Sequence, residues 1–178
     1  IYTGFLMSFP GAIYVELQNK LDTSISIISW IYSSAAIGFI IATLIFGYIA
    51  DHITEIHRLH ALMVFVTSIC IICIPLSKSS DPLIIIFIIC STIGIGFGLN
   101  SLSYCLFIFR LYPINGGKMY FWIVLLVQIS AWIATATIEL SISYTNTFIY
   151  PFIGFAIIGI SYSICLLYTS DAADDVLC

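Results

Sequence analysis

Polar side chains recur at helical spacing inside the long apolar stretches of this sequence. One set follows the spacing i, i+4, i+7 and i+11 and comprises Gln128, Trp132, Thr135 and Glu139. Residues at these intervals share one face of an α-helix. Polar groups at membrane depth are costly and usually face a bundle interior or a water-filled cavity. We therefore expect this face to look inward.

Two further stretches carry similar stripes. The first comprises Ser26, Trp30, Ser33 and Ser34, and the second comprises Gly96, Asn100, Ser103, Tyr104 and Phe107. Aromatic rings together with amide and hydroxyl groups suit a neutral hydroxylated solute such as a sugar. We expect a pathway for such a small-molecule solute to be lined by Asn100, Gln128, Trp30, Trp132, Tyr104 and Thr135. The alternative is that these side chains only join helices through packing and hydrogen bonds.

Glu139 is an acidic residue within the second half of an apolar stretch. A carboxylate in this position is a candidate for coupling solute movement to an ion, either H⁺ or Na⁺. Glu139 also lies close enough to the end of the stretch to have only an interfacial, structural role. We keep both interpretations.

The arrangements that catalysis needs are not found in the sequence. No nucleophile is paired with a base, and neither a carboxylate dyad nor an HExxH motif occurs. The pair Cys70 and Cys73 has redox spacing but lies in an apolar stretch. The histidines at 52, 57 and 60 have no cysteine and no convincing set of carboxylates around them, so a solvated loop is favoured over a metal site or a pH sensor. We expect no enzymatic activity, no metal site and no cofactor.

The composition excludes most classes of soluble protein. The chain has 178 residues, of which 61% are hydrophobic and only 8% are charged, and its mean hydropathy is +1.14. Soluble domains carry roughly 25% charged residues, so this chain lacks the residues to cover a soluble fold. Five Lys and Arg residues form no basic patch, which excludes nucleic acid as a partner.

The uncharged stretches predict an all-α polytopic membrane protein with six transmembrane helices, of which the first is truncated. A bilayer core of about 30 Å needs about 20 residues of helix, and helices satisfy their own backbone groups in lipid. The predicted spans cover about 1–15, 25–50, 60–77, 82–109, 119–141 and 147–168. We expect a multi-pass integral membrane protein, in contact with a lipid bilayer that the sequence does not identify.

The last segment, 165–178, differs in composition from the rest of the chain. From Cys165 to Asp174 an Ile-rich pattern gives way to small and acidic residues. Its codons can be written as the mosaic end and adapter of a transposase-based sequencing library, read through in frame. We therefore expect that native sequence ends near Ile164 and that 165–178 is adapter read-through; the alternative is a natural acidic tail.

Several residues in the first third of the chain form a recognisable order. They are Pro10, Glu16, Leu17, Gly47, Ala50 and Asp51. With them the chain resembles the major facilitator superfamily, in which a proline in helix one and an acidic–Leu pair precede the loop signature G-x-x-x-D-(R/K)-x-G-(R/K)-(R/K). His52 replaces the first base, and Glu55 and Ile56 stand where Gly and Arg are expected. The order and spacing look closest to sugar-transporting branches, including sodium-dependent glucose transporter-like proteins.

The resemblance implies that 1–164 is the N-terminal half of a 12-helix bundle, with a C-terminal six-helix half of the same chain as its partner. It also implies that spans one to three and four to six are inverted repeats around a midplane site. The expected function is secondary active or facilitative transport by alternating access. The alternative is a polytopic membrane protein with a receptor, scaffold or lipid-enzyme role.

Gly47, Asp51 and Arg110 are candidates for a conformational latch. A glycine at the end of a membrane helix allows close backbone approach, and Arg110 ends the fourth span on the same predicted side as Asp51. We expect the charge pair to form in one conformation and to break in the other. The alternative is a solvated pair that contributes well under about 1 kcal/mol.

Overall fold

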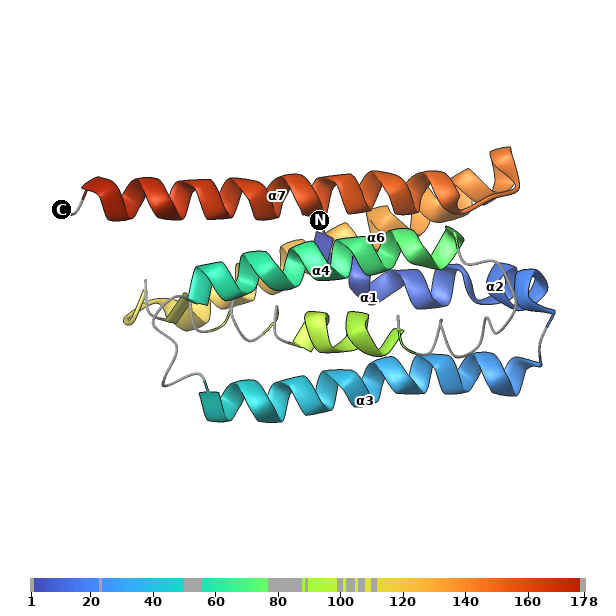
Figure 1. Cartoon of the computed structure of the whole chain (residues 1–178), viewed down its shortest axis with the longest axis horizontal. Helices are drawn as coiled ribbons and strands as arrows, with labels where there is room; N and C mark the ends of the chain where they lie inside the picture. Colours follow the sequence, from blue (N-terminus) through green and yellow to red (C-terminus); the bar gives the residue numbers. More distant parts are fainter. Residues whose placement is uncertain are drawn as a thin grey trace.

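A computed structural model describes residues 2–22, 24–49, 56–76, 88, 90–98, 101, 105, 108–109 and 112–176. Every regular element in this part of the chain is an α-helix (Figure 1). The helices are α1 (Tyr2–Ala12), α2 (Tyr14–Leu21), α3 (Ile25–Ile49), α4 (Ile56–Leu76), α6 (Gly116–Thr145) and α7 (Ile149–Val176). Between α4 and α6, residues 90–98 are also helical, and we call them the 90–98 helix.

Four of these helices are long and apolar enough to cross a membrane, by length and composition. The apolar stretches are Ile25–Ile45, Arg58–Leu76, Gly116–Thr145 and Ile149–Tyr168. Their outward side chains include Leu44 and Leu126, which are 71% and 63% exposed. Extended apolar surface of this kind is stable in lipid and not in water. All regular structure in the described part of the chain is therefore helical, and it has the character of a membrane-embedded protein.

Two of the six predicted spans look different in the structure. The span expected at 1–15 is instead two short helices, α1 and α2, that together reach Leu21. The span expected at 82–109 lies largely outside the described residues, and its central part is the 90–98 helix. Helix α7 continues through Val176, so helical structure extends across most of segment 165–178.

Helices α1 and α2 are divided at Ile13, three residues after Pro10. Proline has no backbone N–H, so Pro10 cannot donate to the Leu6 carbonyl and weakens the helix at this point. The chain turns at Ile13 and resumes as α2, with the Ile13 amide donating to the Phe9 carbonyl at 3.2 Å. Helix α2 then ends where Asp22 adopts a left-handed conformation, with φ of 47°.

The core lies where α1, α4, α6 and α7 meet. Helix α4 packs along α7, and α1 packs along α6 (Figure 1). Phenylalanine side chains join α1 to α7: the rings of Phe5 and Phe155 stack with centroids 4.2 Å apart, and Phe152 meets Phe5 edge-on at 5.2 Å. Such pairs contribute about 0.5–1.5 kcal/mol beyond the area they bury. These contacts fix α1 in the interior.

The 90–98 helix packs against α3 through small residues. A Cβ atom on Gly94 would overlap the backbone of Ala35, and one on Gly38 would meet the Ser91 carbonyl at 2.5 Å. The rings of Phe39 and Phe97 lie beside this contact, with centroids 5.4 Å apart. Small residues let membrane helices approach closely enough for van der Waals packing to hold them together.

Candidate functional site

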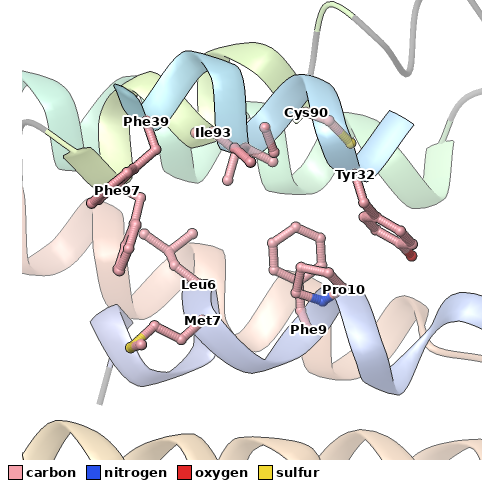
Figure 2. A pocket seen from close by; sticks show the side chains of 12 residues that line it. Leu6, Met7, Phe9, Pro10, Tyr32, Phe39, Cys90, Ile93 and Phe97 are labelled. Atoms are coloured by element: carbon pink, nitrogen blue, oxygen red, sulfur yellow. The ribbon is translucent and has the colours of Figure 1, made fainter. Parts of the chain in front are cut away.

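A cleft lies between α1, α3 and the 90–98 helix. Its first cavity has a volume of about 290 Å³. Figure 2 shows side chains of α3 and the 90–98 helix pointing across it toward α1. The lining residues are Leu6, Met7, Phe9, Pro10, Tyr32, Ala35, Ala36, Phe39, Cys90, Ile93, Gly94 and Phe97.

A second cavity adjoins the first and extends the cleft to α6. Its volume is about 310 Å³. The two cavities share Met7, Phe39 and Phe97, which therefore mark the boundary between them. The second cavity is lined by Thr3, Met7, Phe39, Phe97, Ser101, Tyr120, Ile123, Val124, Val127 and Gln128.

Two close helix contacts position the walls of this cleft. Gly94 brings the 90–98 helix against α3 at Ala35. In the same way Gly4 brings α1 against α6, because a Cβ atom on Gly4 would overlap Ser130 and Ala131. Each contact is a backbone approach that a larger side chain would prevent. The cleft is the space between the two closely packed pairs.

The described lining of the cleft carries few polar groups, and one of them is the Tyr32 hydroxyl. Among the described residues, the buried Tyr32 Oη has no hydrogen-bond partner. The ring stacks on Tyr14 with centroids 5.6 Å apart, whereas the Tyr14 hydroxyl has the Ser29 hydroxyl at 3.1 Å and donates to the Ile25 carbonyl. An unsatisfied buried hydroxyl costs about 1–3 kcal/mol. Tyr32 thus carries an unmet hydrogen-bonding requirement at one end of the first cavity.

The cleft has no charged groups along its described lining. Gln128 supplies an amide to the second cavity, and the Ser101 hydroxyl there already donates to the Phe97 carbonyl at 2.9 Å. The remaining side chains are mainly aromatic or aliphatic. Because burial of an isolated ion in such surroundings is very costly, the cleft favours neutral molecules.

A third cavity, of about 340 Å³, lies where α2 approaches the connection between α6 and α7. It is lined by Glu16, Asn19, Asn146, Thr147, Phe148 and Ile149. These residues lie at helix ends, where backbone groups and polar side chains meet. This cavity is separate from the residues of the cleft.

The predicted pathway residues have different positions in the structure. Gln128 lines the second cavity of the cleft. Trp30 and Trp132 are 70% and 80% exposed and do not line either cavity of the cleft. Thr135 is half-buried, and its hydroxyl donates to the Ala131 carbonyl at 3.0 Å in its own helix. Asn100 and Tyr104 lie outside the described residues.

The polar stripe of Gln128, Trp132, Thr135 and Glu139 owes its position to the packing of α6. The buried side of this helix carries Ser130, Ala131, Ala134 and Ile138. The polar stripe lies next to that side, so Gln128 reaches the cleft while Trp132 faces outward. Helical periodicity alone places residues on one face but does not say which neighbour covers it.

The other predicted residues are described only in part. Gly47 lies in α3, whereas Asp51 and Arg110 lie outside the described residues. Glu139 is exposed on α6. In the part of the chain that the structure describes, no three His, Cys, Asp or Glu side chains gather in a way that would hold a metal ion.

Most residues of the cleft were not identified from the sequence, and Tyr32, Met7 and Phe97 are examples. Tyr32 gave the clearest signal, because a phenol hydroxyl inside an apolar span requires a partner. It lies between Trp30 and Ser33, which were selected for their spacing. Met7 and Phe97 have no such signal, since apolar residues at helical spacing are typical of any core.

Comparisons with known proteins identify no relative of this chain. The chain has no significant match to any protein-family model, to any curated protein or to any solved structure. Its function is therefore argued from the arrangement of the helices and the chemistry of the cleft.

Proposed function

We propose that this chain is one bundle of a membrane transporter that moves a small neutral solute by alternating access. The observation that carries the proposal is that helices from the two halves of the chain pack on one another in a symmetric pattern. Two sets of three helices follow one another along the chain: α1, α3 and α4, then the 90–98 helix, α6 and α7. The first helix of each set packs on the second helix of the other, and the two third helices pack together.

The two cross-contacts also agree in detail. Gly4 of α1 meets Ser130 and Ala131 of α6, and Gly94 meets Ala35 of α3. Ala35 follows Ser34, whose hydroxyl donates to the carbonyl three residues back in α3, at 2.5 Å. Ser130 makes the equivalent bond in α6, at 2.8 Å. Corresponding positions of the two sets thus carry the same pair of small residues with the same local hydrogen bond.

Equivalent helices of the two sets run in opposite directions. Along the chain, α1, α3, α4, the 90–98 helix, α6 and α7 alternate in direction (Figure 1). The first helix of one set is therefore antiparallel to the first helix of the other. Inverted repeats of this kind are characteristic of secondary transporters, whose solute sites lie at the interface between the repeats.

The cleft occupies this interface, because both cross-packed pairs contribute to its walls. Alternating access needs a second body against which the bundle moves. The resemblance to the major facilitator superfamily supplies that body as a second six-helix half of the same chain. The outward positions of Trp30 on α3 and Trp132 on α6 provide surface for such a partner.

Solute flux tests the proposal. The full-length gene product is reconstituted in proteoliposomes and screened for counterflow of labelled neutral solutes. Met7 borders both cavities, so Met7→Trp should fill the cleft and abolish flux. Leu126→Trp places the same ring on an exposed surface and should leave flux intact.

Two results would contradict transport. One is solute movement no faster than in empty liposomes, which would favour a receptor or scaffold role. The other is full activity in Met7→Trp, which would separate the cleft from the transport pathway.

A further inference from the structure

We infer that the cleft binds a neutral, mainly apolar small molecule with one hydroxyl group, and that the Tyr32 hydroxyl is its polar anchor. This inference rests on the proposed function, because it names the class of solute for the same site. It favours an apolar alcohol or phenol over the polyhydroxylated solute that the sequence pattern suggests.

The size and lining of the cleft favour an apolar body. The first cavity, about 290 Å³, is at the small end of ligand pockets, which range over roughly 300–1,000 Å³. Its lining includes Leu6, Phe9, Ile93 and Phe97, and no described lining residue is charged. A sugar would need a hydrogen-bond partner for each buried hydroxyl, and the described lining of the cavity does not provide that number. An apolar ring or chain would lose no hydrogen bonds on entry.

The polar end of the cavity favours a single hydroxyl group. Tyr32 Oη is buried and unpartnered within the described residues, and Figure 2 shows its ring at one end of the cavity, on the side of Phe9 and Pro10. The Tyr32 hydroxyl is thus the polar group that this end of the described lining offers to a ligand. A ligand hydroxyl can accept a hydrogen bond from Tyr32 Oη or donate one to it.

The position of the Tyr32 ring is set by its neighbour. Tyr14 stacks on it at an interplanar angle of 26° and is itself held by Ser29 and Ile25. The hydroxyl is therefore presented by a ring that is packed in place. Preorganisation of this kind reduces the entropy cost of binding.

The test measures equilibrium binding of 1-naphthol to the chain in lipid nanodiscs, after subtraction of binding to empty nanodiscs. Saturable binding is expected, with competition by unlabelled 1-naphthol and none by D-glucose. Tyr32→Phe removes one oxygen and should weaken 1-naphthol binding about ten-fold, while binding of naphthalene stays the same. Tyr150→Phe makes the same change on an exposed ring and should have no effect.

A second variant fills the first cavity and so tests whether the ligand binds there. Ala36 lines the first cavity, so Ala36→Phe should abolish binding of both 1-naphthol and naphthalene. Loss of folding is excluded by an unchanged elution volume in size-exclusion chromatography. If Ala36→Phe fails to fold, the Tyr32→Phe comparison decides alone, because that variant removes a destabilising group.

Three results would overturn the inference: no saturable binding of 1-naphthol, equal binding to Tyr32→Phe, or displacement by D-glucose. Binding does not require flux, so the two proposals fail separately. If the protein binds 1-naphthol through Tyr32 but transports no solute, the binding site is supported and the transport proposal is contradicted. If the protein transports a sugar and does not bind 1-naphthol, the transport proposal is supported and the inferred ligand class is contradicted.

Discussion

The side-chain oxygens of Tyr2 and Thr67 lie 2.7 Å apart and join α1 to α4 in the interior of the bundle. The Ser68 hydroxyl donates to the Tyr2 oxygen at 3.0 Å. Tyr2 and Tyr32 therefore contrast directly: one buried phenol is fully engaged between helices, and the other has no partner among the described residues.

The same substitution should have opposite effects at these two tyrosines. Tyr2→Phe should lower the free energy of unfolding by about 1 kcal/mol, the scale of interhelical hydrogen bonds in membranes. The loss is limited because the Thr67 and Ser68 hydroxyls have carbonyls of their own helix within hydrogen-bond distance as alternative acceptors. Tyr32→Phe should raise stability by about 1 kcal/mol or more, because it removes an unsatisfied group. Thermal unfolding of the ligand-free protein in detergent measures both, and a shift of equal sign would contradict the assignment.

The close contact at Gly94 should not tolerate even one methyl group. Gly94→Ala places a Cβ atom on the Ala35 backbone, so the helices must separate at a cost of about 1–3 kcal/mol. Gly154 in α7 has nothing within 4 Å of the corresponding position. Gly154→Ala is the matched control and should be neutral or stabilising by up to about 1 kcal/mol. Equal melting temperatures for the two variants would show that Gly94 does not hold the 90–98 helix against α3.

Glu139 should be needed for ion coupling and not for binding of the solute. It is exposed on α6, so Glu139→Gln preserves shape without disturbing the core. We expect ion-driven accumulation to disappear in the full-length protein while solute exchange continues. Glu16→Gln, on α2, is the control and should retain accumulation. Normal accumulation in Glu139→Gln would assign Glu139 a structural role at the interface.

The predicted latch between Asp51 and Arg110 should depend on opposite charge and not on the identity of the residues. Asp51→Arg and Arg110→Asp should each abolish flux, and the double variant should recover it because the attraction is restored with its sign reversed. Combining Asp51→Arg with Arg58→Asp controls for net charge and should give no recovery. Absence of rescue in the first double variant would contradict the latch.

The origin of segment 165–178 is decided by the gene. We expect that genomic DNA after the codon for Ile164 does not contain the codons for Asp171, Asp174 and Asp175. Amplification from genomic DNA across this position provides the measurement. Recovery of the same acidic codons would establish a natural tail.

The sequence by itself determined the class of the protein. A chain with 8% charged residues and long uncharged stretches has to form helices in lipid, because lipid offers no partner for open backbone groups. The positions of α3, α4, α6 and α7 were predicted to within a few residues at their starts, since charges and turns interrupt apolar runs. The break at Ile13 was not predicted, because neither a turn residue nor a charge stands at that position in the sequence.

Only the tertiary structure decided which residues meet. The spacing of Trp132 and Gln128 is the same helical pattern, yet Gln128 lines the cleft and Trp132 faces outward. Periodicity fixes the angle between side chains on one helix, whereas the neighbour that each face meets depends on how the helices pack. The site at Tyr32 likewise exists because Gly94 and Gly4 bring separate helices together, leaving a buried hydroxyl beside an apolar cleft.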